Sequence, residues 1–407
     1  MNVLFVHQGF PAQFKGLISL LARMPGVRLA AIGTRDATYA YVDYRRYSPP
    51  EERPDAGRVE EEAAMHIARA EAVVAQAKRL RADGFEPDIV LAHTGWGEAL
   101  LLRDTYPRAR IACYCEYYYR RAGGDVGFDP EFPLPSEAAM HRLRVRNGLG
   151  LAAMEDADLC LSATQWQRST YPAAFRDRIE VFHEGVDTGR LTSFARAEHA
   201  PLRASLGIPP RAPVVSYCAR HLEPMRGFHT FMRSLPALLK ERPDAHVLIV
   251  GTDEGGYGAS PQGLRSGART WKEALLRELD GRLDASRVRF LGSLPYDGYG
   301  AVLACADVHV YLTAPFVLSW SAVEAMAMGK AIVASATAPV TEFMMHGKNA
   351  RLVDFFAPDA LAATVSDLLA DAAERDRLGN GARATVERRS LDRNTASRAV
   401  WARLQSL

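Results

Sequence analysis

Short apolar runs and helical patterns alternate along almost the whole chain, and no other feature restricts its fold as much. In the first half, apolar runs typical of buried strands occur at 2–7, 27–33, 88–93, 109–115, 157–164 and 179–185. Helical patterns separate most of these runs, including a long amphipathic stretch at 59–83. A chain that alternates in this way forms parallel sheet with helices on both faces.

The alternation stops between Asp187 and Pro213, where a polar stretch rich in Pro and Gly takes its place. It then restarts, with strand patterns at 213–219, 246–251, 287–292, 307–312, 331–335 and 350–354. At 407 residues the chain is longer than one core usually supports. We therefore expect an α/β protein with two facing, doubly wound, Rossmann-like domains and a cleft between them. The expected parts are a first domain, a linker, a second domain and a C-terminal helix that packs back on the first domain, at 1–190, 191–212, 213–389 and 390–407.

Composition restricts the partners and the compartment. The net charge is only +2 and neither half is strongly basic, so no nucleic acid partner is expected. The five cysteines are odd in number and lack metal-ligand spacing, which is typical of reduced thiols in a cytoplasmic protein. The sequence shows no basic segment leading into an apolar one at its start, and no run of about 18 apolar residues. We expect neither export nor insertion into a membrane.

Two arginines in the second half predict an anion site. A strand pattern ends near Arg220, and Arg226 with Gly227 opens the following helix. The N–H groups at a helix N-terminus favour phosphate, and guanidinium groups bind it bidentately, so a diphosphate fits here. The alternative is a pair of solvated arginines that cap neighbouring elements.

Glu324 is a single carboxylate in an otherwise apolar helix that follows a strand and a turn. A charge in such surroundings loses hydration worth several kcal/mol, roughly, unless a partner replaces the water. The partner is either internal, an arginine or a backbone N–H, or a hydroxyl of a ligand. Ser319 and Ser321 precede Glu324, and they either contact the same ligand or cap the helix.

Three residues in the first half stand where parallel strands end. His93 ends one strand pattern, Glu116 ends the next, and Gly9 follows the first strand. Ligands of open α/β sheets bind at this edge. A glycine permits close approach of the backbone to a phosphate or sugar, although a glycine at a strand end often only makes the turn. Likewise, an isolated histidine is often structural, but two polar residues at neighbouring strand ends favour a site.

Several stretches resemble the family 4 (group 1) glycosyltransferases of the GT-B fold. In the first half they are PDIVLAHTGWGEALLLRD (87–104) and RIEVFHEGVDTGRL (178–191). In the second half they are ARHLEPMRGFHTFMRSLP (219–236), FVLSWSAVEAMAMGKAIVAS (316–335) and GKNARLVD (347–354). Together they cover most of the chain in the order of the family. The resemblance implies an acceptor-side first domain and a second domain that binds a nucleotide sugar.

The resemblance also implies roles for individual residues. Arg220 and Arg226 would bind the donor diphosphate, although the family more often has Lys where Arg226 stands. Glu324 would accept hydrogen bonds from the ribose diol. The family usually has a further Glu eight positions before Glu324 that contacts the donor sugar, and this chain has Phe316 there. Backbone N–H groups of the turn, or Ser319 and Ser321, would then contact the sugar.

A retaining transfer that needs neither a metal ion nor a separate cofactor is a further implication, with the nucleoside-diphosphate sugar as co-substrate. His93 and Glu116 would be the catalytic residues, although the family commonly has His where Glu116 stands. Glu116 would orient the acceptor hydroxyl or stabilise positive charge at the anomeric carbon, and His93 would bind the donor phosphate or sugar. The leaving diphosphate would help to take the acceptor proton.

Two irregular stretches lie near these positions. The stretch at 116–133 combines aromatic, basic and acidic residues, which suits a carbohydrate acceptor or a mobile surface loop. In the stretch at 251–273, Asp253 and Glu254 are either donor contacts or solvated charges. The expected acceptor is a glycan or a lipid-linked acceptor in cell-surface polysaccharide synthesis. A lipid-linked acceptor would allow peripheral contact with the inner face of the membrane.

Other functions are compatible with the same pattern. A nucleotide-sugar epimerase or hydrolase would share the fold. Phe316 would also fit a non-catalytic protein that binds a nucleotide sugar. A dinucleotide-dependent dehydrogenase is disfavoured, because neither half has G-x-G-x-x-G after its first strand.

Overall fold

The computed structural model describes residues 1–50, 58–256, 261 and 267–407, and it divides into two compact units. The first unit is Met1–Gly185 with Arg393–Leu407, and the second is Val186–Asp392. The predicted linker, 191–212, contains most of helix α7 (Thr188–Arg196) and all of α8 (Ala200–Ser205). Asp187 caps α7 by accepting a hydrogen bond from the backbone N of Arg190 at 3.0 Å. Pro201 lies in the first turn of α8 and Gly207 follows the helix, so the Pro- and Gly-rich stretch begins and ends a short helix of the second unit.

The first unit contains a seven-stranded parallel sheet in the order β3-β2-β1-β4-β5-β6-β7. Its strands are β1 (Asn2–Val6), β2 (Arg28–Gly33), β3 (Val42–Arg46), β4 (Ile89–His93), β5 (Arg110–Tyr114), β6 (Leu159–Ser162) and β7 (Ile179–Val181). Because side chains alternate along a strand, β1 buries Val3 and Phe5 in one core and Leu4 and Val6 in another.

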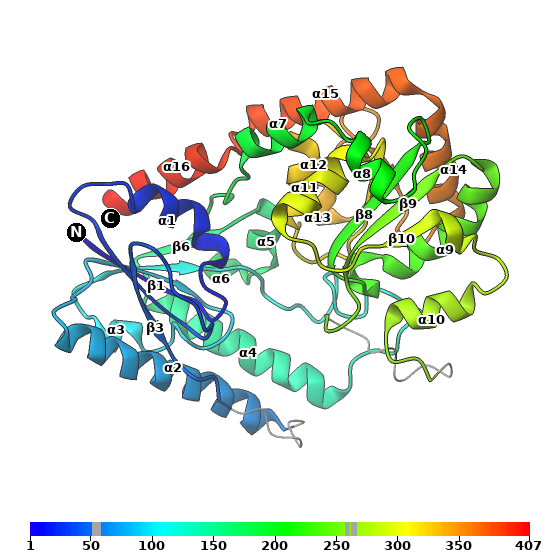
Figure 1. The fold of residues 1–407 in the computed structure, drawn as a ribbon. Helices are drawn as coiled ribbons and strands as arrows, with labels where there is room; N and C mark the ends of the chain where they lie inside the picture. The colour runs from blue at the N-terminus through cyan, green and yellow to red at the C-terminus, as the bar shows by residue number, and fades with distance from the viewer. Residues whose placement is uncertain (51–57, 257–260, 262–266) are drawn as a thin grey trace. The chain divides into compact units, whose positions relative to one another are not determined.

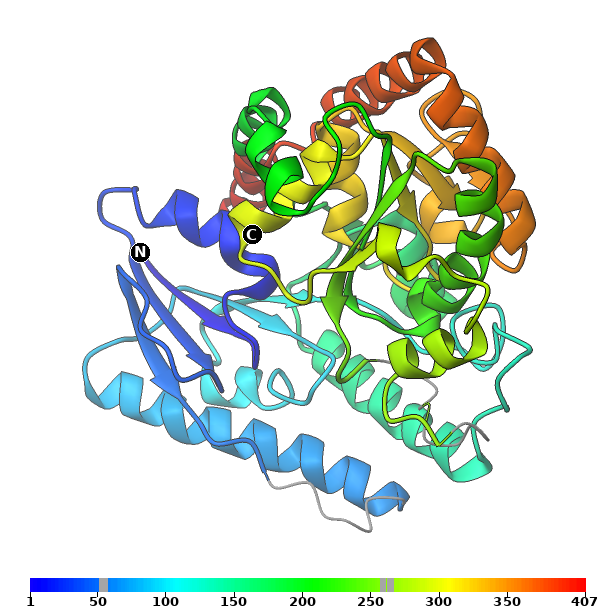
Figure 2. The same cartoon turned by 45° about the vertical axis from the view of Figure 1, so that its right-hand side comes forward.

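Helices cover both faces of this sheet (Figures 1 and 2). One face carries α1 (Lys15–Leu21) and α16 (Arg393–Gln405), and the other carries α2 (Val59–Ala82), α3 (Leu102–Thr105) and α4 (Glu137–Glu155). The short helices η1 (Ala12–Phe14), α5 (Gln165–Thr170) and α6 (Ala173–Arg176) complete the unit. The C-terminal helix α16 lies against α1 and buries Trp401 and Leu404 in the core on that face. A Cβ atom at Gly16 would lie 2.6 Å from Ser397 Oγ, so this glycine allows the two helices to approach closely.

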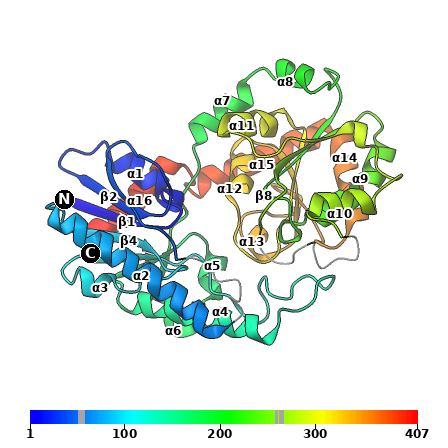
Figure 3. The same cartoon turned by 60° about the horizontal axis from the view of Figure 1, so that its bottom comes forward.

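The second unit contains a six-stranded parallel sheet in the order β10-β9-β8-β11-β12-β13. Its strands are β8 (Val214–His221), β9 (His246–Thr252), β10 (Val288–Phe290), β11 (Val308–Tyr311), β12 (Ala331–Ser335) and β13 (Arg351–Val353). One face carries α9 (Phe228–Glu241), α10 (Trp271–Glu278) and α14 (Pro358–Ala370). The other carries α7, α8, α11 (Tyr296–Cys305), α12 (Trp320–Ala327) and α15 (Ala372–Arg388), as Figure 3 shows for several of them. Short helices η2 (Pro224–Arg226), η4 (Ala285–Arg287) and α13 (Ala338–Thr341) connect these elements.

Each sheet reverses its strand order once. The reversal lies between β1 and β4 in the first unit and between β8 and β11 in the second. Ligands of doubly wound folds bind outside the carboxyl ends of the strands at such a switch point. The expected Rossmann-like, doubly wound fold class is therefore confirmed for each unit. Among the described residues, no helix has both the length and the apolar character needed to cross a bilayer.

Candidate functional site

Glu324 lies on α12, and its side chain is buried, with 6% of the residue exposed. Its two carboxylate oxygens accept hydrogen bonds from tyrosine hydroxyls of α11: Tyr296 donates to Oε1 and Tyr299 to Oε2, each at 2.8 Å. Sequence reasoning had considered an arginine, a backbone N–H or a ligand hydroxyl, and it had missed the tyrosines. Their spacing of three residues puts both hydroxyls on one side of α11. In the sequence, two tyrosines three residues apart in the helix before a strand were the signal that could have identified these partners.

Arg226 lies in η2, directly after β8, and its guanidinium braces the turn that follows β11. Nη1 donates to Thr313 Oγ1 at 2.9 Å and to the carbonyl oxygen of Val317 at 3.0 Å. Its Cζ atom lies 5.8 Å from the ring centre of Phe316, which is 5% exposed. Arg226 and Phe316, two of the positions where the chain departs from the family it resembles, are thus in contact.

Arg220 and the start of α9 stand at the same edge of the second sheet. The Arg220 side chain is exposed at the end of β8 and has no hydrogen-bond or ion-pair partner in the described part of the chain. Helix α9 begins at Phe228, and the residue before it, Gly227, has a φ of 67° and offers no side-chain cap. A Cβ atom at Gly227 would lie 2.4 Å from Leu312 Cβ, so only glycine lets α9 begin this close to the end of β11. An exposed guanidinium at the same sheet edge as a helix N-terminus is suited to binding an anion.

Ser319 and Ser321 begin α12, but the Ser319 side chain does not cap it. The two hydroxyl oxygens lie 2.5 Å apart, and the backbone N–H of Ser319 donates to the Tyr311 hydroxyl at 2.8 Å. The sequence allowed helix capping as an alternative role for Ser319, but its hydroxyl does not cap α12.

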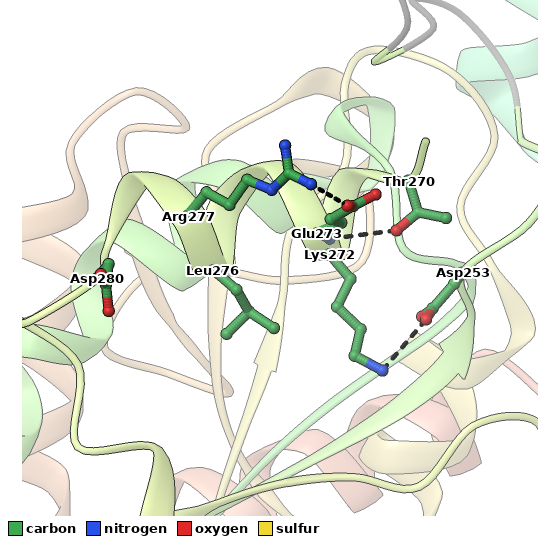
Figure 4. Close-up of a pocket in the computed structure, with 7 residues that line it drawn as sticks. All are labelled: Asp253, Thr270, Lys272, Glu273, Leu276, Arg277 and Asp280. Atoms are coloured by element: carbon green, nitrogen blue, oxygen red, sulfur yellow. Dashed lines mark hydrogen bonds and ion pairs between the residues drawn. The ribbon is translucent and has the colours of Figure 1, made fainter. Parts of the chain in front are cut away.

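Figure 4 shows a pocket beside α10, lined by Asp253, Thr270, Lys272, Glu273, Leu276, Arg277 and Asp280. Lys272 Nζ lies 3.1 Å from Asp253 Oδ2, and Arg277 pairs with Glu273. Asp253, considered from the sequence as a donor contact or a solvated charge, therefore forms an ion pair. Part of the same stretch, 257–260 and 262–266, lies outside the described residues.

In the first unit, His93 and Glu116 lie at the carboxyl ends of the neighbouring strands β4 and β5. His93 Nε2 is 3.4 Å from Glu116 Oε2, and Gln13 Nε2 donates to Glu116 Oε1 at 2.8 Å. Burial acts to raise the pKa of Glu116, but His93, His7 and Gln13 together hold it below its usual value. Glu116 is thus a carboxylate at neutral pH, with 30% of its side chain exposed.

His7 is a third member of this group, and sequence reasoning missed it. It follows β1, which is the neighbour of β4, and its ring centre lies 4.9 Å from that of His93. Burial, followed by the proximity of His93, lowers the pKa of His7 to about 3, so its imidazole is neutral at pH 7. The backbone N–H of Gly9 donates to His7 Nδ1 at 2.8 Å.

The same arrangement occurs at three strand ends of the first unit. In His7-Gln-Gly9, His93-Thr-Gly95 and His183-Glu-Gly185, the glycine N–H donates to Nδ1 of the histidine at 2.8, 3.0 and 2.9 Å, respectively. Since Nδ1 is an acceptor, the neutral imidazole carries its proton on Nε2. The recurring H-x-G pattern was the signal in the sequence that would have found His7.

The stretch at 116–133 contains no helix or strand, but its beginning is held in place. Asn147 of α4 accepts from the backbone N of Tyr119 at 3.1 Å and donates to its carbonyl oxygen at 2.7 Å. Arg120 donates to the carbonyl oxygen of Thr170 at 2.8 Å. These bonds fix the backbone directly after Glu116.

Two family profiles match the chain. One, described as Glycosyl transferase family 4 group, matches residues 25–191, and the other, described as Glycosyl transferases group 1, matches residues 212–371. Together they take in most of the chain, one for each unit.

Curated relatives share part of the sequence. A D-inositol 3-phosphate glycosyltransferase of Mycolicibacterium gilvum is 31% identical over 194 residues, which is 47% of this chain and 39% of the relative. A phosphatidyl-myo-inositol mannosyltransferase of Mycobacterium tuberculosis is 31% identical over 220 residues, or 53% of this chain and 49% of the relative. The matches thus span half or less of the length of these two relatives.

Solved structures share the fold. The crystal structure of Anabaena Alr3699/HepE in complex with UDP superposes with a TM-score of 0.70 at 18% sequence identity and covers 100% of both chains. With two Rossmann-like units of this topology, and with a glycosyltransferase profile matching each of them, the chain belongs to the family 4 (group 1) glycosyltransferases of the GT-B fold.

Proposed function

We propose that this protein transfers a sugar from a nucleoside-diphosphate sugar to a glycan or lipid-linked acceptor, with retention of anomeric configuration and without a metal ion. The proposal rests on the residues at one edge of the second sheet, where a nucleotide-sugar donor would bind. This edge combines the exposed Arg220, the N-terminus of α9 and the buried carboxylate of Glu324. A diphosphate needs the cationic groups, and a ribose diol needs the acceptor.

The comparisons support this choice of substrates. HepE was solved with UDP and also with UDP-glucose, and the curated relatives are named for inositol acceptors and mannosyl transfer. A lipid-linked acceptor would bring the protein to the inner face of the membrane, in cell-surface polysaccharide synthesis. The five free, buried cysteines favour a reducing compartment such as the cytoplasm.

The catalytic part of the proposal rests on the first unit. Glu116 would stabilise positive charge at the anomeric carbon or orient the acceptor hydroxyl, because it stays a carboxylate. The Nε2–H group of His93 would donate a hydrogen bond to an oxygen of the donor phosphate or sugar. In a retaining transfer, the acceptor oxygen bonds to the anomeric carbon on the face that the diphosphate leaves. The bond from that carbon to the diphosphate oxygen breaks, and the same oxygen takes the acceptor proton.

Thermal unfolding with UDP, GDP, ADP, dTDP, CMP and NAD tests the donor site. A ligand present at 100 times its dissociation constant adds roughly 2.7 kcal/mol, or about 5–10 °C for a unit of this size. We expect one nucleoside diphosphate to raise the midpoint of the wild type but not of Glu324→Ala or Arg220→Ala. Asp367→Ala and Arg211→Ala, at exposed positions of the same unit, are the matched controls.

Turnover assays with the same variants separate the alternatives. Loss of transfer in Glu324→Ala and Arg220→Ala, with an intact fold, supports the transferase. Sugar release or epimerised donor without any acceptor indicates the hydrolase or epimerase instead. Binding without turnover indicates a non-catalytic protein, and a shift with NAD alone refutes the proposal.

A further inference from the structure

Glu324 and two tyrosines of α11 form one hydrogen-bonded group, which we call the Tyr-Glu-Tyr clamp: Tyr296, Glu324 and Tyr299. A carboxylate has about four lone-pair sites, two on each oxygen. The clamp uses one site on each oxygen, since each tyrosine hydroxyl donates to a different one. One acceptor site therefore remains on each oxygen of Glu324, and a vicinal diol has two donors to fill them.

The charge of Glu324 is not neutralised within the chain. Among the described residues it forms no ion pair, and its hydrogen-bond partners are the two neutral hydroxyls. Its charge also adds to the effect of burial in raising the pKa of Cys218 on β8 and of Tyr299. A buried carboxylate with unfilled acceptor sites can accept further hydrogen bonds from a ligand. Its burial costs free energy until those sites are filled.

The clamp is itself held in place. Arg190 of α7 lies with its Cζ atom 4.8 Å from the ring centre of Tyr296 and pairs with Asp297 at 2.5 Å. The rings of Tyr296 and Tyr299 lie 5.9 Å apart, and that of Phe194 lies 6.0 Å from Tyr296. The hydroxyls are therefore fixed by ring contacts, and they in turn fix the plane of the carboxylate.

We propose that Tyr296 and Tyr299 are positioning residues that orient Glu324 so that its two remaining acceptor sites face the two hydroxyls of the donor ribose. This inference rests on the proposed function and deepens it. The tyrosines touch the carboxylate and act on the ligand through it. Without them, the carboxylate would rotate freely about its last torsion, and the diol would have to order it on binding.

Calorimetric binding of paired nucleotides tests the clamp. The probes are the diphosphates of uridine, guanosine and adenosine, each with its 2′-deoxy analogue, and inorganic pyrophosphate. For the base that binds, we expect the wild type to prefer the ribonucleotide by about tenfold or more, because the missing hydroxyl leaves a charged acceptor unpaired. Tyr296→Phe and Tyr299→Phe should each lower this preference, and the double variant should reduce it to about twofold. Pyrophosphate affinity should not change.

Tyr106→Phe is the matched control, because it removes a buried hydroxyl bond, to the carbonyl oxygen of Ala77 at 3.1 Å, in the first unit. Each single variant is measured as well, in case the double variant does not fold. An unchanged ribose preference in the variants, with donor binding and turnover intact, refutes the clamp but not the transferase. Tighter nucleotide binding in the variants also refutes it, since the tyrosines would then compete with the ribose. If no probe binds the wild type, the proposed function fails together with the clamp.

Discussion

Replacing Gly9 by alanine should separate an effect on ligand binding from an effect on folding. Its backbone does not adopt a left-handed conformation, and an added Cβ atom would lie 3.5 Å from His7 Cε1, 3.6 Å from His7 Nδ1 and 3.9 Å from Arg35 Nη2. All three are ordinary van der Waals distances. The folded protein therefore has room for alanine, and its N–H would still donate to His7. Nothing in the packing of the described residues requires glycine here.

For Gly9→Ala we expect stability to be kept or slightly raised. Alanine has fewer conformations in the unfolded chain, which is worth about 0.4–1 kcal/mol, or about 1–4 °C in the midpoint of a unit this large. If a phosphate or sugar approaches this backbone, the methyl group will obstruct it. We then expect kcat/KM to fall at least about tenfold, which corresponds to about 1.4 kcal/mol.

The assay pairs thermal unfolding with donor kinetics for Gly9→Ala and Gly33→Ala. At Gly33 a Cβ atom would lie 2.7 Å from the backbone oxygen of His7 and 2.9 Å from the Tyr44 hydroxyl, so this control should lower the midpoint. Full activity in a stable Gly9→Ala protein would refute the assignment of Gly9 to the donor site. A large loss of stability in Gly9→Ala would refute the packing argument.

Two further predictions concern ionisable side chains, one in each unit. His7 faces His93, Glu116, Gln13 and Arg35, and its pKa is about 3 when folded against 6.5 when unfolded. The unfolded state alone takes the proton in this window, so stability falls as the pH falls below 6.5, by roughly 2 kcal/mol down to pH 5. Denaturant unfolding should show a flatter pH dependence for His7→Gln, and equal slopes would contradict the buried, neutral imidazole. Arg226→Lys removes the guanidinium that donates hydrogen bonds to Thr313 and Val317. We expect about tenfold weaker binding of inorganic pyrophosphate by calorimetry; unchanged affinity would show that Arg226 only braces the turn.

Much of the architecture could be predicted because its signals are local. The strand patterns ending at His93 and Glu116 match β4 and β5, and β4 pairs with β5, so the expected neighbours at the sheet edge are in fact neighbours. Period-two burial, right-handed crossovers and the position of a turn after each strand are set by short stretches of chain. The helices within 191–212 could not be predicted from the sequence, because Pro and Gly begin and end short helices as readily as they form a linker.

The partners of the site residues depended on contacts between distant parts of the chain. The amino-acid order was enough to show that Glu324 needs a partner, because an apolar helix cannot hydrate a carboxylate. It could not show that Tyr296 and Tyr299, 28 and 25 residues earlier, provide that partner, since this follows from how α11 and α12 lie against the same sheet. In the same way, Arg226 reaches Thr313 across 87 residues, and His7 meets His93 because β1 and β4 are adjacent. Local propensity determines the elements, whereas the pairing of side chains is decided by distances that exist only once the sheets have formed.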